Sequence, residues 1–122
     1  MPIRVAMAQL ATRVGDIDGN VAAIRAVWHE AAGLGADLVV FTELAITGYP
    51  PEDLLLKPEF LAAADAAVTE LAATGPHGTV AVFGTVGRVG TGEPVDDGNS
   101  GEMTSREITV SAGQLRNRAV VV

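Results

Sequence analysis

The sequence predicts an α/β protein, because strand-like and helix-like patterns alternate along its first two thirds. Residues 3–9 alternate between larger apolar side chains and other residues with a period of two, which is typical of a strand. Residues 37–41 form a short, continuous apolar run of the kind found in strands buried on both faces. Residues 79–84 are a third run rich in β-forming residues. With helices between these runs, the order β-α-β-α-β favours an α/β sheet over an all-α or all-β fold.

Two helices are expected between the strands. The first is predicted over residues 20–32, after turn-forming and capping residues at 15–20. Its apolar side chains recur at helical spacing, at Val21, Ile24, Val27, Trp28 and Ala31. The second helix is expected to begin at Pro58, because proline is favoured at a first helical position. Its apolar face would consist of Phe60, Leu61, Ala64, Val68 and Leu71.

The C-terminal third has a different character. Residues 89–114 are rich in Gly, Thr, Ser, Asp and Glu and show little apolar periodicity, so we expect a long flexible loop there. Residues 115–122 end in Ala-Val-Val-Val, which predicts a last strand whose partner could lie beyond residue 122.

Composition restricts the kinds of partner and site. The formal net charge is −7, so we expect neither nucleic acid nor an anionic membrane as a partner, because both attract basic surfaces. The sequence has no cysteine, which excludes disulfides, thiolate metal sites and a cysteine nucleophile within these residues. His29 and His77 are far apart in the sequence, and no metal site is expected. The sequence shows neither the pattern of a signal peptide nor an apolar run long enough to span a membrane, so a soluble, cytoplasmic protein is expected.

One acidic residue follows the apolar run that we expect to be a central strand. Glu43 comes two residues after Phe41, which would place its carboxylate at the C-terminal end of that strand. Open α/β sheets usually bind ligands at this edge, and a carboxylate there could act as a general base. Position alone supports equally well a structural role, in which Glu43 caps the following loop.

Four segments, in order, resemble one enzyme superfamily. They are Ala8–Leu10, Val14–Asp16 with Gly19–Asn20, Ala36–Phe41, and Glu43–Leu44 through Gly48–Leu55. Their residue types and spacing resemble the nitrilase (carbon–nitrogen hydrolase) superfamily. The Tyr-Pro-Pro-Glu-Asp-Leu-Leu stretch is most similar to the glutaminase domain of bacterial glutamine-dependent NAD synthetases. The resemblance implies that residues 1–122 are an incomplete domain of this type, with part of its α-β-β-α sandwich fold.

The resemblance also implies a mechanism. These enzymes hydrolyse an amide through a thioester, with a Glu-Lys-Cys triad. The Cys attacks the side-chain amide of glutamine, the Lys stabilises the oxyanion, and the Glu transfers a proton from the thiol to the departing ammonia. Glu43 matches the general base, and Tyr49 is expected to line the substrate pocket. ATP and Mg are used by the separate synthetase domain of this family, so no cofactor is expected in this chain.

The match to the triad is incomplete. The family's Lys and Cys lie on later segments, and the only lysine here, Lys57, matches no catalytic position. Thr42 stands where the family usually has proline before the Glu. We therefore expect the chain to be inactive by itself.

Three functions remain open. The chain could be the N-terminal portion of the glutaminase domain of an NAD synthetase, with glutamine as substrate, and residues 50–53 favour this. It could instead be a fragment of a stand-alone amidase of the same superfamily that acts on another small amide. The third possibility is a non-catalytic, truncated α/β module, which the missing Lys and Cys support. Homo-oligomers are typical of the family, and a truncated sheet would expose an unpaired edge and apolar helix faces, which predicts self-association.

Overall fold

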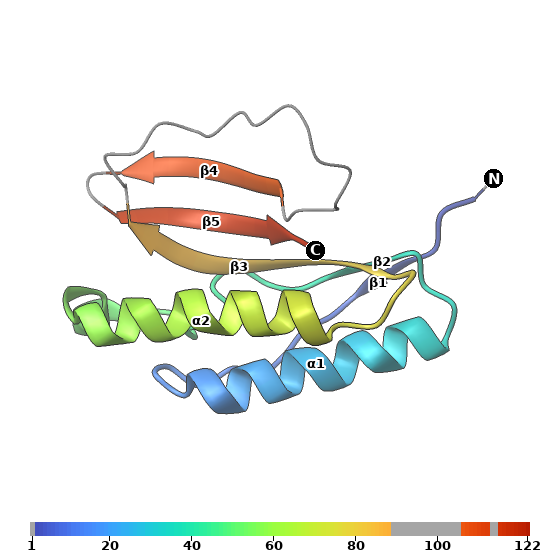
Figure 1. Ribbon diagram of the computed structural model, residues 1–122, viewed down its shortest axis with the longest axis horizontal. Helices are drawn as coiled ribbons and strands as arrows, with labels where there is room; N and C mark the ends of the chain where they lie inside the picture. The colour runs from blue at the N-terminus through green and yellow to red at the C-terminus, as the bar shows by residue number, and fades with distance from the viewer. Residues whose placement is uncertain (1, 89–105, 113–114) are drawn as a thin grey trace.

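The computed structural model describes residues 2–88, 106–112 and 115–122. These residues form one sheet of five strands with two α-helices on one side of it (Figure 1). The α/β fold class is therefore confirmed. In chain order the elements are β1 (Val5–Met7), α1 (Ile17–Gly33), β2 (Leu38–Val40), the 3-10 helix η1 (Glu52–Leu56), α2 (Pro58–Thr74), β3 (Val80–Arg88), β4 (Arg106–Ala112) and β5 (Leu115–Val121).

The sheet has the strand order β1-β2-β3-β5-β4 and is mixed. β1, β2 and β3 are parallel neighbours, as expected for strands joined through helices, whereas β5 runs antiparallel to both β3 and β4. The last strand thus has both of its partners within this chain, and the expectation of a partner beyond residue 122 is wrong. The reason is the length of β3, which continues past Gly84 to Arg88 and pairs with β5 over seven residues.

The expected long loop is interrupted by a strand. Residues 106–112 form β4, so for these residues the loop prediction is wrong. Residues 89–105 and 113–114 lie outside the described residues. The run Ile108-Thr109-Val110 has the β-branched residues that favour strands. It is short and lies among polar residues, so it becomes a strand through its pairing with β5 rather than through a strong local pattern.

Both predicted helices are present, with small changes at their ends. α1 begins at Ile17, three residues before the predicted start, because the Asp16 carboxylate accepts a hydrogen bond from the Gly19 amide at 3.0 Å and caps the helix. α2 begins at Pro58 as expected. The short helix η1, between the proline-rich loop and α2, was not anticipated.

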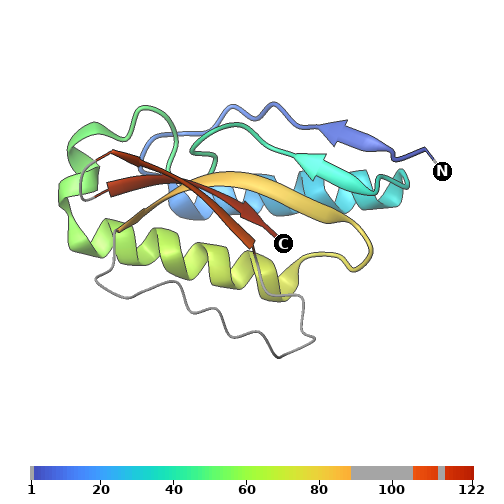
Figure 2. The same ribbon diagram turned by 90° about the horizontal axis from the view of Figure 1, so that it is seen from above.

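The core lies between the helices and one face of the sheet. Figure 2, seen from above, shows the strands crossing over α1 and α2. Val39 of β2 and Phe83 of β3 are fully buried on this face, as are Ile24 of α1 and Leu71 of α2. Trp28 is 2% exposed, and its indole nitrogen donates a hydrogen bond to the Thr79 carbonyl oxygen at 2.9 Å. The apolar faces predicted for both helices are therefore the faces that the sheet covers.

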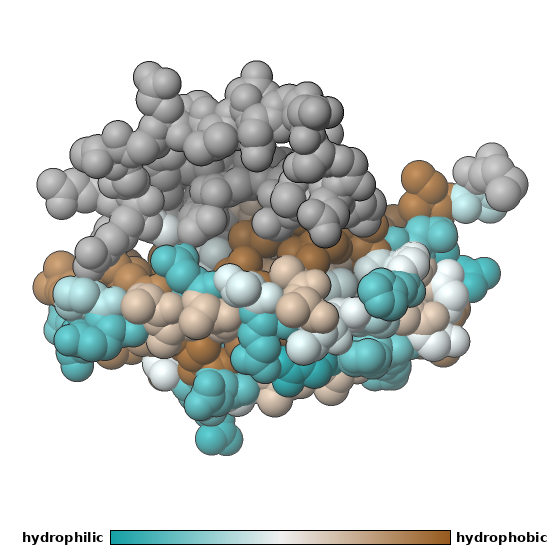
Figure 3. Space-filling model, in the orientation of Figure 1, coloured by the Kyte–Doolittle hydropathy of each residue, from teal (hydrophilic) through white to brown (hydrophobic). Residues whose placement is uncertain are grey.

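The opposite face of the sheet is apolar but less completely buried. Residues in register on neighbouring strands lie on the same side. On this side Val5 and Met7 are exposed, and five residues are partly buried: Leu38, Val40, Val80, Val82 and Val121. Further along β3, Gly84 and Val86 on the same side are buried. Figure 3 shows hydrophobic residues gathered on the sheet side of the molecule, above the helices. The apolar surface that α1 and α2 do not bury is thus a sheet face, which we call the open face. The expectation of exposed apolar helix faces is wrong, because α1 and α2 turn those faces into the core.

One segment after β2 crosses this open face. The amide of Phe41 donates to the Val82 carbonyl oxygen at 2.8 Å, and the amide of Ile46 donates to the Gly84 carbonyl oxygen at 3.3 Å. Between these two bonds the chain forms a turn that rises over Gly84. A Cβ atom at Gly84 would overlap the backbone nitrogen of Leu44 and would stand 3.0 Å from two backbone atoms of Glu43. Only glycine allows this approach.

The open face should make the isolated chain self-associate. Met7 and Val5 are 87% and 50% exposed on edge strand β1, and we expect lysine at both positions to reduce association, because charge opposes both apolar contact and edge pairing. Sedimentation velocity at several concentrations measures this. Leu34→Lys is the control, since Leu34 is 70% exposed beyond the end of α1 and away from the open face. A compact monomer at all concentrations would contradict the prediction.

Gly84→Ala should destabilise the chain by about 2 kcal/mol, because the added methyl group would force the turn away from β3. Urea unfolding gives the free energy of unfolding of both proteins. Gly33→Ala is a matched control: a Cβ atom there meets nothing within 4 Å, and alanine is favoured over glycine in a helix. Equal losses in the two variants would show that the crossing does not depend on Gly84.

Candidate functional site

The candidate carboxylate stands where the sequence placed it. β2 ends at Val40, and Glu43 opens the turn that follows, at the C-terminal end of a parallel strand. Its side chain is exposed. The amide of Gly48 donates to the Leu44 carbonyl oxygen at 2.9 Å and closes the turn. We call residues 43–47 the Glu43 turn.

The backbone of this turn is held in an unusual conformation. Leu44 has φ of 51°, in the left-handed region that costs a non-glycine residue about 1–2 kcal/mol. The cost is offset by burial, since Leu44 is only 7% exposed and the next two residues, Ala45 and Ile46, are fully buried. The strained residue directly follows the candidate general base. Strain of this kind is concentrated at functional sites.

The other singled-out residues lie further along the same segment. Tyr49 is 68% exposed and lies just after the Glu43 turn, before η1. An aromatic side chain there is accessible to a substrate. Lys57 is exposed and precedes the first residue of α2, where its backbone amide donates to the Leu54 carbonyl oxygen at 3.0 Å. The structure thus exposes Glu43 and Tyr49 at the two ends of a buried stretch, residues 44–48, and places Lys57 at the start of a helix.

One residue that holds the turn was not identified from the sequence. Asn20 is 3% exposed in the first turn of α1. Its side chain makes hydrogen bonds to the backbone of Arg13 and to the carbonyl oxygen of Ile46. The sequence signal was the Gly19-Asn20 pair in the family-like motif, which was interpreted as turn and capping chemistry. Asp16, not Asn20, caps α1.

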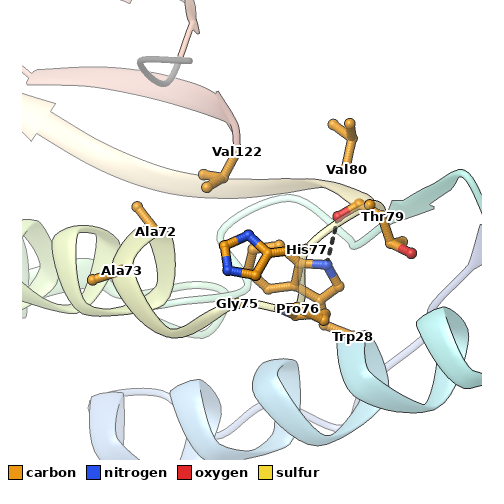
Figure 4. A pocket seen from close by; sticks show the side chains of 10 residues that line it. Trp28, Ala72, Ala73, Gly75, Pro76, His77, Thr79, Val80 and Val122 are labelled. Carbon is orange, nitrogen blue, oxygen red and sulfur yellow. Dashed lines mark hydrogen bonds between the residues drawn. The ribbon is translucent and has the colours of Figure 1, made fainter. Parts of the chain in front are cut away.

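A cavity of about 500 Å³ lies elsewhere in the molecule. Figure 4 shows it between the end of α2 and the start of β3, with Trp28, His77 and Val122 among its lining residues. Because β2 and β3 are parallel, this is the opposite end of the sheet from Glu43. The indole nitrogen of Trp28 is already bonded to Thr79. The cavity is therefore separate from the candidate site.

Two kinds of feature are absent from the part of the chain that the structure describes. No group of three or more His, Asp or Glu side chains there is arranged to hold a metal ion. None of the helices in that part combines the length and apolarity needed to cross a membrane.

Known proteins resemble this chain over most of its length. The carbon-nitrogen hydrolase family model matches residues 4–114. A glutamine-dependent NAD(+) synthetase of Xylella fastidiosa is 49% identical over 83 residues, which cover 67% of this chain and 15% of the relative. The matched part of the chain thus spans less than a sixth of the length of that protein.

Solved structures share the fold. A glutamine-dependent NAD(+) synthetase from Cytophaga hutchinsonii superposes with a TM-score of 0.67 and 29% identity, over 71% of this chain and 15% of that one. An amidase from Nesterenkonia sp. superposes with a TM-score of 0.59 and 26% identity, over 70% of this chain and 32% of that one. Because the family model matches residues 4–114, the chain belongs to the carbon-nitrogen hydrolase family, and its similarity to these structures agrees with that.

Proposed function

We propose that this chain is the N-terminal portion of the glutaminase domain of a glutamine-dependent NAD synthetase, and that Glu43 is its general base. The observation that carries the proposal is the exposed Glu43 carboxylate at the C-terminal end of β2, on a turn fixed over Gly84. The 49% identity to the Xylella synthetase supports the choice of glutamine as substrate.

The chemistry follows from this placement. Glu43 takes the proton from the thiol of a cysteine supplied by a later segment of the domain, and the thiolate attacks the side-chain amide of glutamine. A lysine, also from a later segment, stabilises the oxyanion. Glu43 then gives the proton to the departing ammonia, which leaves a thioester for hydrolysis. Tyr49 lines the substrate pocket. The released ammonia amidates deamido-NAD in a synthetase domain that uses ATP and Mg.

The stand-alone amidase is the second candidate. The structural similarity to the Nesterenkonia amidase supports the shared chemistry of amide hydrolysis. The 49% identity over 83 residues is to a glutamine-dependent synthetase, and this favours glutamine over another small amide. In either case the Glu43 carboxylate has the same role.

The 122-residue chain alone should release no ammonia from glutamine. It contains no cysteine, and a general base without a nucleophile has nothing to activate. A coupled assay for ammonia measures the rate. Turnover above background that Glu43→Gln abolishes would contradict the triad mechanism.

A chimera tests the role of Glu43 directly. Residues 1–88 of this chain replace the matching segment of the Xylella synthetase, and NAD synthesis is measured with glutamine and, separately, with ammonium as nitrogen donor. We expect Glu43→Gln to lower glutamine-dependent synthesis at least about a hundredfold, because the amide cannot accept the thiol proton. Ammonium-dependent synthesis should be unchanged, since it does not need the glutaminase site.

A matched carboxylate serves as the control for this chimera. Glu59→Gln removes an exposed carboxylate in the first turn of α2 and should leave both activities unchanged. Full glutamine-dependent activity in the Glu43→Gln chimera would overturn the proposed function.

A further inference from the structure

A buried amide side chain joins α1, the loop before it and the Glu43 turn. The Asn20 side-chain oxygen accepts a hydrogen bond from the Arg13 amide at 2.9 Å. Its nitrogen donates to the Arg13 carbonyl oxygen at 2.8 Å and to the Ile46 carbonyl oxygen at 3.0 Å. Asn20 is 3% exposed. Both donor hydrogens and the acceptor oxygen of this side chain therefore form hydrogen bonds. These bonds link α1 to the loop before it and to the Glu43 turn.

We propose that Asn20 is a positioning residue, which fixes the Glu43 turn so that the carboxylate keeps one place above β3. The inference rests on the proposed role of Glu43 and adds the residue that holds it. It acts through the backbone three residues beyond Glu43, at Ile46.

Ile46 is held on both sides of its own backbone. Its amide donates to the Gly84 carbonyl oxygen of β3 at 3.3 Å, and its carbonyl oxygen accepts from Asn20. Glu43 lies between this doubly held point and the Phe41 amide, which β3 also holds. If the Asn20 bond is lost, the buried Ile46 carbonyl is left without that partner, and a turn that already carries a strained Leu44 can relax.

A second contact pins the same turn to the loop before α1. The Gly15 amide donates to the Thr47 carbonyl oxygen at 3.0 Å. A Cβ atom at Gly48 would stand 2.6 Å from the Val14 nitrogen, so the two backbones pack directly. Asn20 ties this loop to α1 through Arg13. The loop and the turn therefore hold their positions together.

Helix capping does not explain this side chain. Asp16 caps α1 by accepting from the Gly19 amide. Asn20 points instead to backbone atoms outside the helix, one of them 26 residues away. Aspartate has nearly the same shape but cannot donate, and it would place a carboxylate against two carbonyl oxygens. The site requires the amide.

The test compares Asn20→Asp with Trp28→Phe in the 122-residue chain. Trp28→Phe also removes one buried side-chain-to-backbone hydrogen bond, to Thr79 at the opposite end of the sheet. Native-state hydrogen exchange is measured at the amides of Ile46 and Gly48. The NMR signal of the Glu43 side-chain carboxyl carbon reports the environment of the carboxylate.

We expect Asn20→Asp to speed exchange of the Ile46 and Gly48 amides at least about tenfold more than Trp28→Phe, after correction for global stability, and to move the Glu43 signal. Asn20→Ser, shorter but uncharged, should do the same with a smaller loss of stability, which keeps the test available if the aspartate variant does not fold. Equal exchange at these amides in all three variants, with an unmoved Glu43 signal, overturns the proposal.

The outcome is independent of catalysis. Exchange reports the geometry of the turn, whereas the Glu43→Gln chimera reports the role of the carboxylate. If the Glu43→Gln chimera keeps full activity but the Asn20 variants displace the turn, the proposed function is removed and the anchoring by Asn20 stands. If Glu43→Gln lowers glutamine-dependent synthesis as expected but the Asn20 variants leave the turn unchanged, only the positioning role is removed.

Discussion

The close passage of the Glu43 turn over β3 is the contact on which the arrangement of the candidate site depends. Gly84 lets the backbone of Glu43 and Leu44 lie directly on the strand, and the bonds from Phe41 and Ile46 to β3 fix both ends of the crossing. β3 is itself the central strand, paired with β2 on one side and β5 on the other. The turn is therefore bonded to the middle of the sheet. A carboxylate held in this way can act on a substrate without first being ordered.

The molecule has two unlike sides. Helices α1 and α2 bury one face of the sheet, with Trp28 and Phe83 as its largest buried side chains, whereas the open face carries in-register apolar residues that are exposed or only partly buried. The Glu43 turn stands on the open face, since a Cβ atom at Gly84 would point to the same side as Val82. The face that carries the proposed catalytic group is therefore also the face with apolar surface to cover.

The elements of the first two thirds of the chain could be predicted because their signals are local. Period-two alternation, an apolar run and helical spacing are each read within a single segment, and Pro58 marks a helix start by its fixed φ. β4 could not be found in this way, since its strand state comes from pairing with β5. The same holds for the start of α1: the side-chain bond of Asp16 decides it, and several nearby polar residues could have made that bond.

By itself the sequence determined the α/β class, the two helices, the position of Glu43 after the second strand and, by resemblance, the family. These depend on residue types and their spacing along the chain. Only the tertiary structure decided which face of the sheet is covered, that Gly84 lies beneath the Glu43 turn, and that Asn20 anchors this turn rather than caps a helix. Each of these is a contact between residues far apart in sequence, and a local pattern carries no information about the partner across such a contact.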